Sequence, residues 1–351
     1  MSARFLASVG VSAALVAMLA LVEAEPVAGQ APPATKKAAA ARDWKQSRTL
    51  WGDPDLQGVW TSNDMWFVPM ERPPEFGDRK LLTEEEWAAR HKEAKAQNEG
   101  TNQRSAGDPG AGPTHWYERA PGTSWQTSLV VEPPDGRIPW TPKGLEANRA
   151  RQAVMRRPPA SWLDANLWDR CITRGLPSVM IPTSYNNAYQ IVQTPGYVTI
   201  RYEMLAYRVI PLDGRPHVDS RIRMWEGDSR GHWEGNTLVV DVTNFSDKTN
   251  GNLRAYGSYA GNGETLHLVE RFTRVDADTV NYEATLEDPV AYTRPWTVAI
   301  PLRSDPDYRM FEYACHEGNY AMANRLSGAR ADEKKAAEDA AKNAGKESSG
   351  R

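Results

Sequence analysis

Alternating apolar and polar residues predict β-strands throughout the second half of the chain. In the segment 278–287, Val280, Tyr282, Ala284 and Leu286 fall at every second position, with polar residues between them. A period of two places one face of a strand against a core and the other in solvent. Nine segments are predicted as strands from such patterns: 189–194, 197–205, 207–212, 221–225, 236–245, 264–274, 278–287, 295–302 and 308–315.

Short turns join these segments, as at 194–196, 213–214 and 234–235, where Gly follows Pro, Asp or Glu. No segment of helical length lies between them, which argues against a parallel sheet with crossover helices. Many short antiparallel strands close into a barrel or pack as a sandwich. We therefore predict a mainly β fold, an antiparallel meander that forms a lipocalin- or calycin-like barrel, with a sandwich as the alternative.

Three helices are predicted outside the strands. Thr83 and Glu86 form a capping box that opens a helix reaching about residue 97. Thr141 as N-cap, with Pro142 in the first helical position, opens a second helix that ends near residue 157. A third helix is expected over 320–330, after the last strand.

The chain is predicted to divide into five parts. A basic start and an apolar run precede small residues at Val22 and Ala24, so 1–24 is predicted as a signal peptide, with a retained membrane anchor as the alternative. A low-complexity spacer (25–42) and an irregular region with two helices that wraps around the rest (43–170) follow. The β domain and its closing helix occupy 171–330, and 331–351 is predicted to be a disordered charged tail.

The two cysteines, Cys171 and Cys315, are predicted to form a disulfide, because export leads to an oxidising compartment. We expect a periplasmic or secreted protein. The bond would bring Arg174 close to His316 and Glu317. The formal net charge of −3 predicts no nucleic-acid partner and no attraction to an anionic membrane.

Some predicted strand faces carry charged residues among apolar ones. Glu270 shares a face with Phe272, Glu312 shares one with His316, and Arg201 shares one with Glu203. A barrel that holds a ligand needs a few convergent polar groups in an apolar lining. The structural alternative is that Glu270 and Glu312 pair with buried arginines, or lie where a strand twists outward.

Several standard motifs are absent or out of context. Residues 227–231 match the G-x-S-x-G pattern around Ser229, but another strand rather than a helix follows, which indicates an ordinary loop. The six histidines lack metal-ligand spacing, and neither a phosphate loop nor a dinucleotide fingerprint is present. We predict neither a metal nor a cofactor.

The remaining polar clusters give the candidate site. His316 is the candidate acid/base, Glu317 its orienting partner, and Arg174 a group that binds a carboxylate or an oxyanion. The alternative role of Glu317 and Asn319 is to cap the following helix. The candidate ligand-binding residues are Arg170, Tyr185, Asn186, Asn187, Glu203, His232, Trp233, Glu270, Glu312 and Asn319.

Linked motifs resemble a family of uncharacterised exported bacterial proteins. They are RCITRG at 170–175, QTPGY at 193–197, GHWEGNTLVVD at 231–241, EDPVAYTRPW at 287–296 and EYACHEGNY at 312–320. The resemblance spans roughly 53–330 and implies export, but it carries over no activity and no catalytic residue. Separately, GVW at 58–60 is similar to the G-x-W that opens lipocalin barrels, which favours a barrel over a sandwich.

The function predicted first is binding of a small, partly apolar molecule in the mouth of the barrel. The alternative is a cofactor-independent lyase, isomerase or hydrolase that uses His316 and Glu317. A third hypothesis is a structural or interaction protein of the cell envelope. The sequence makes no prediction of oligomeric state.

Overall fold

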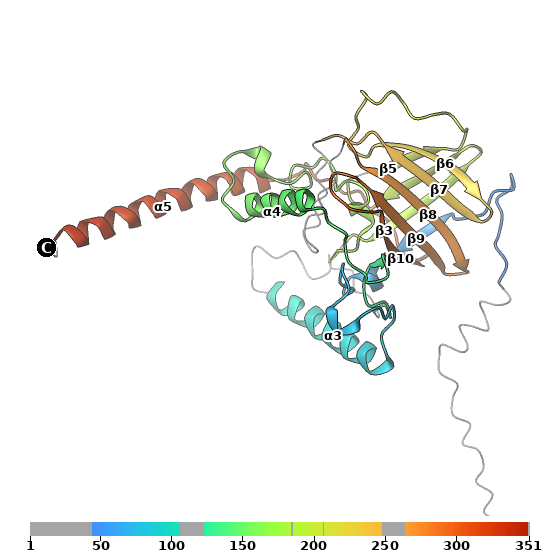
Figure 1. Ribbon diagram of the computed structural model, residues 1–351, viewed down its shortest axis with the longest axis horizontal. Helices are drawn as coiled ribbons and strands as arrows, with labels where there is room; N and C mark the ends of the chain where they lie inside the picture. Colours follow the sequence, from blue (N-terminus) through green and yellow to red (C-terminus); the bar gives the residue numbers. More distant parts are fainter. Residues whose placement is uncertain (1–43, 106–122, 184, 206, 248–263, 350–351) are drawn as a thin grey trace, which may run out of the picture. The chain divides into compact units, whose positions relative to one another are not determined.

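The strands form one antiparallel sheet in the order β5-β4-β3-β1-β10-β9-β8-β7-β6, with β2 additionally paired to β10. Figure 1 labels β3 and β5 to β10 of this sheet. The computed structural model describes residues 44–105, 123–183, 185–205, 207–247 and 264–349, and the sheet lies within the unit Gln46–Arg351. The strands are β1 Gly58–Thr61, β2 Val130–Glu132, β3 Ala188–Thr194, β4 Tyr197–Tyr202, β5 Tyr207–Pro211, β6 Asp228–Glu234, β7 Thr237–Thr243, β8 His267–Asp276, β9 Thr279–Glu287 and β10 Trp296–Ser304.

The two ends of this strand order, β5 and β6, pack against each other, so the sheet makes a nearly closed barrel of nine strands. Gly231 on β6 permits this approach. A Cβ atom there would lie 2.6 Å from the side chain of Leu212 and 2.8 Å from that of Ile210. The predicted barrel is therefore confirmed, and its seam closes over a residue without a side chain.

Side chains fill the barrel interior. Val280, Tyr282, Ala284 and Leu286 are fully buried, which confirms the face predicted from their alternation. The largest buried aromatic side chains of the core are Trp60, Trp296, Tyr189, Tyr282, Phe245 and Phe272. These side chains belong to one hydrophobic core cluster.

Two of the predicted strands are wrong. The segment 221–225 makes only an isolated bridge, between Met224 and Phe245. The segment 308–315 has no strand assignment, because β10 before it is already paired with β9 and β1 and leaves no free edge. The shared strand face predicted for Glu312 and His316 is therefore also wrong.

Three strands were not predicted: β1, β2 and β6. The first two are short, and β6 has the sequence DSRGHWE, which lacks apolar alternation. Strand β1 comes from the region predicted to wrap around the barrel, yet it lies between β3 and β10 as part of the barrel. Its Trp60 is buried, and the indole N–H donates to the carbonyl of Leu56 at 2.9 Å.

The predicted helix starts are confirmed. Helix α3 (Glu84–Ser105) opens with the capping box, in which the Thr83 N–H donates to Glu86 Oε2 at 2.8 Å. Helix α4 (Pro142–Arg156) is capped by Thr141, whose hydroxyl oxygen accepts from the Gly144 N–H at 2.9 Å. Short 3₁₀ turns cover Asn63–Met65, Pro74–Phe76, Trp162–Asp164 and Ser178–Met180.

Helix α5 runs over Ala321–Ser349, well past the predicted end near residue 330. The prediction of a disordered tail is wrong up to residue 349, because Ala, Lys and Glu are strong helix formers. The predicted signal peptide (1–24) and spacer (25–42) lie outside the described residues. Within the described part of the chain, no helix is both long and apolar enough to cross a membrane.

Candidate functional site

A disulfide joins the segment after β10 to the segment before β3. Cys171 and Cys315 are bonded, with their Cα atoms 5.6 Å apart across a sequence separation of 144 residues, as predicted. The Asn319 amide donates to Cys171 Sγ at 2.8 Å, and its oxygen accepts from the Ala321 N–H at 2.9 Å. Asn319 therefore has the helix-capping role that was its structural alternative, and it also fixes α5 to the disulfide.

A pocket of about 860 Å³ lies beside this disulfide. Strand registers place it at one end of the barrel, where β3 begins and β4 and β10 end. It is lined by Trp168, Asp169, Tyr185, Asn186, Glu203, Tyr308, Phe311, Glu312, Tyr313, Ala314, Cys315, Asn319 and Ala321.

Hydrogen bonds fix the walls of this pocket to the barrel. Glu203 is 6 % exposed; its Oε2 accepts from the Ala188 N–H at 3.1 Å, and its Oε1 accepts from the Tyr308 hydroxyl. On another wall, the indole N–H of Trp168 donates to the Tyr313 hydroxyl at 3.3 Å. The irregular segment after β10 is thus attached at both Tyr308 and Tyr313.

Half of the predicted ligand-binding residues line this pocket. They are Tyr185, Asn186, Glu203, Glu312 and Asn319. Asn187 is buried next to it and donates to Asn63 Oδ1 and to the Thr183 carbonyl, both at 2.8 Å, so it holds the loop that carries Asn186. Arg170 lies outside the lining and stacks its guanidinium on the Trp162 ring, 4.5 Å from the ring centroid.

The predicted catalytic residues do not form a dyad. His316 and Glu317 are exposed in the turn that follows Cys315, and among the described residues no hydrogen bond joins their side chains. Arg174 is buried, and its guanidinium lies 5.4 Å from the centroid of Trp168. The acid/base assignment of His316 and Glu317 stays a prediction.

Three further predicted residues lie elsewhere. His232 is exposed on β6, where it contacts Glu234 Oε1 at 3.2 Å. Trp233 is partly buried against the barrel core. Glu270 points into the barrel and is fully buried, as its strand pattern predicts.

Glu270 is held by an ion pair inside the barrel, which confirms the pairing that was its structural alternative. Arg208 on β5 donates to Glu270 Oε2 at 2.5 Å, and the Tyr282 hydroxyl donates to Oε1 at 2.9 Å. Burial alone would lower the pKa of Arg208, but the negative charge of Glu270 raises it above its ordinary value. The pair is buried and is a structural part of the core.

Glu226 extends this buried cluster toward the disulfide loop. Its Oε1 accepts from the hydroxyl of Thr173, two residues after Cys171. Burial raises the pKa of Glu226, and the nearby charge of Arg208 opposes that shift. The cluster thus links the barrel interior to the loop that carries Arg174.

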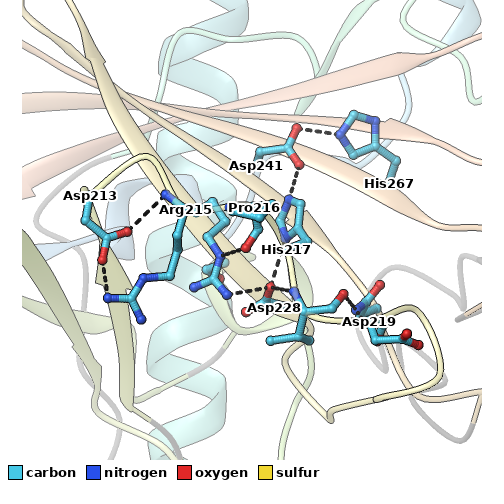
Figure 2. A network of polar contacts seen from close by, with 12 residues as sticks. Asp213, Arg215, Pro216, His217, Asp219, Asp228, Asp241 and His267 are labelled. Carbon is cyan, nitrogen blue, oxygen red and sulfur yellow. Dashed lines mark hydrogen bonds and ion pairs between the residues drawn. The ribbon is translucent and has the colours of Figure 1, made fainter.

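A second polar network lies on the outer face of the sheet (Figure 2). His217, in the connection between β5 and β6, places Nδ1 3.0 Å from Asp228 Oδ2 and Nε2 2.7 Å from Asp241 Oδ1. His267 on β8 reaches the other oxygen of Asp241 at 2.7 Å, and its Nδ1 lies 3.4 Å from Glu287 Oε2.

Both partners of the Asp241–His267 contact have shifted pKa values. Partial burial opposes ionisation of Asp241, but hydrogen bonds from His267 and His217 lower its pKa overall. Burial likewise opposes protonation of His267, but the bond to Asp241 raises its pKa. Among the described residues no group of three His, Cys, Asp or Glu side chains is arranged to hold a metal ion. We interpret this network as a structural one: through His217 it holds the connection at 213–227 against the sheet.

The sequence reasoning missed the aromatic walls of the pocket. Trp168 precedes the disulfide loop, and Tyr308, Phe311 and Tyr313 follow β10. The signal was present as three aromatic residues within the seven positions before Cys315, but that segment was interpreted as a strand. A strand would have placed Phe311 and Tyr313 on the face opposite Tyr308.

Comparison with protein-family models, with curated protein sequences and with solved structures finds no match for this chain. The resemblance to a family of exported bacterial proteins therefore stays a prediction. What can be said of function rests on the geometry of the chain's own residues.

Proposed function

We propose that this protein binds a small, partly apolar molecule in the pocket beside the disulfide. One observation carries the proposal: a cavity of about 860 Å³ is lined by five aromatic side chains together with carboxylate and amide groups. Ligand sites of proteins typically have volumes of ~300–1,000 Å³, mostly apolar walls and a few polar groups that fix orientation.

The pocket, rather than the barrel interior, is the place for a ligand. The interior is filled by aromatic and aliphatic side chains and by the Arg208–Glu270 pair. The pocket wall, in contrast, is held in place by Tyr308, Tyr313 and the Cys171–Cys315 bond. A wall fixed before the ligand arrives reduces the entropy cost of binding.

The test fills the pocket with a side chain. Ala314 lines the pocket and is exposed, so Ala314→Trp places an indole in the cavity without disturbing the barrel core. Ala336→Trp, on the exposed surface of α5, is the matched control. Binding is measured by saturation-transfer NMR of the full, oxidised chain against a library of aromatic and cyclic fragments.

We expect the wild type and Ala336→Trp to bind a common set of fragments that Ala314→Trp has lost. Fragments that bind Ala314→Trp as well as the wild type would contradict the proposal. A wild-type protein that binds none of the fragments would contradict it equally.

We further propose that the protein acts outside the cytoplasm, in the periplasm or as a secreted protein. The disulfide supports this, because such bonds persist in oxidising compartments. Native mass spectrometry of the chain expressed with its own N-terminus in a bacterium tests it. Cleavage near Ala24 and an oxidised cysteine pair are expected, whereas an uncleaved chain with reduced cysteines would overturn the assignment.

A further inference from the structure

The lining of the pocket carries charge of one sign. Its lining residues include three acidic residues, Asp169, Glu203 and Glu312, and two asparagines, and include no Lys, Arg or His. Its other large groups are the rings of Trp168, Tyr185, Tyr308, Phe311 and Tyr313. Ring faces and carboxylates both attract positive charge.

We infer that the pocket takes an organic cation, a substituted ammonium group attached to a small apolar body. This inference rests on the proposed binding function and specifies the chemical class of its ligand. The apolar part would pack on the aromatic rings. The ammonium group would be attracted by ring faces and by carboxylate charge, whereas an anion would be repelled by the same groups.

Each arginine near the pocket already contacts another group of the protein. Arg325 pairs with Asp169 and offsets that one charge. Arg201 donates to the carbonyl of Phe311 at 3.0 Å and contributes no atom to the lining. Arg174 lies over the ring of Trp168, so this ring already binds one cation on a face.

Glu312 is the carboxylate best suited to a test. It is exposed as well as pocket-lining, so Glu312→Gln removes one negative charge without burying a new polar group. Glu338→Gln, on the exposed surface of α5, removes the same charge far along the chain from the pocket residues and serves as control.

The experiment compares three probes of one shape and different charge. Choline carries a trimethylammonium group where 3,3-dimethylbutan-1-ol carries a neutral tert-butyl group of the same shape, and 3,3-dimethylbutanoate keeps the tert-butyl group but ends in a carboxylate. Each is titrated into the oxidised full chain by ligand-observed NMR. We expect choline to bind roughly tenfold more tightly than the alcohol, and the carboxylate to show no binding. Glu312→Gln should weaken the binding of choline roughly three- to tenfold and leave the affinity for the alcohol unchanged. Glu338→Gln should change neither affinity.

The outcomes separate this inference from the proposed function. If the alcohol binds as tightly as choline, or if Glu312→Gln leaves choline binding unchanged, the pocket binds ligands but not through their positive charge. If none of the three probes binds and the fragment library gives no pocket ligand, the proposed function fails together with the inference.

Discussion

Arg208 and Glu270 illustrate how one residue can be predicted and its partner missed. Glu270 was expected to point inward because it alternates with apolar residues on its strand. Arg208 was not, because β5 turns its apolar Tyr207 and Val209 outward, where they are 73 % and 50 % exposed. The apolar residues Tyr207 and Val209 would suggest that their face of β5, rather than the face of Arg208, points into the core. Only the closed barrel shows that Arg208 is the partner of Glu270.

Removing Arg208 is predicted to be costly. Arg208→Met leaves the Glu270 carboxylate buried without its counter-charge, so we expect the free energy of unfolding to fall by about 3–5 kcal/mol. Replacing both partners, as Arg208→Met with Glu270→Leu, should recover most of the loss. Urea denaturation at pH 7 measures both. A single variant that loses less than about 1 kcal/mol, or a double variant no better than the single one, would refute a charged buried pair.

At the scale of elements, strands with alternating apolar residues were predicted from the sequence, and strands without that pattern were missed. Seven of the nine predicted strands overlap observed strands, because their alternation reports a buried face. Strand β6 was missed because its sequence lacks apolar alternation, and its register is set by pairing with β7. The segment 308–315 has strand-like residues, but β10, the strand before it, is already paired on both sides.

The contact between Asp241 on β7 and His267 on β8 is predicted to weaken as pH rises. His267 has a raised pKa, so its contribution to stability is complete below its ordinary value of about 6.5 and is lost as pH rises through the folded-state pKa. Asp241 has a lowered pKa, so its contribution is present above its ordinary value of about 3.8 and is lost as pH falls through the lowered one. The network therefore stabilises most at weakly acidic pH.

Asp241→Asn tests this prediction. The substitution removes the charge shared by His217 and His267, so the decline in unfolding free energy between pH 6 and 9 should shrink by about 1 kcal/mol. Asp219→Asn, which breaks only an exposed pair with Arg221, is the control and should keep the wild-type slope. The unfolding free energy is measured by urea denaturation across this pH range. If it declines equally with pH in the wild type and in Asp241→Asn, the network is not the cause of the decline.

At the scale of the whole molecule, two cysteines were the strongest long-range signal in the sequence. Their pairing correctly brought the end of the barrel to the loop before β3, and five predicted binding residues line the pocket that results. The pocket-lining roles of Trp168 and Phe311 were missed, because irregular segments and this bond, rather than a strand pattern, bring both residues to the pocket. A binding site formed by irregular segments has no periodicity that a sequence can display.

Loss of the disulfide is predicted to affect both stability and the pocket. Cys171→Ser with Cys315→Ser should lower the free energy of unfolding by about 2–5 kcal/mol, because the bond closes a long loop. The same variant should lose fragment binding while far-ultraviolet circular dichroism still reports the barrel. Unchanged binding affinity in this variant would show that the bond does not shape the pocket.

The most direct test of the central claim is a crystal structure of the oxidised full chain soaked with a fragment that binds it in solution. The account predicts ligand density between Trp168 and Phe311, in contact with the Tyr313 ring and within reach of Glu312. Density inside the barrel or on another surface, with this pocket closed by its own side chains, would contradict it.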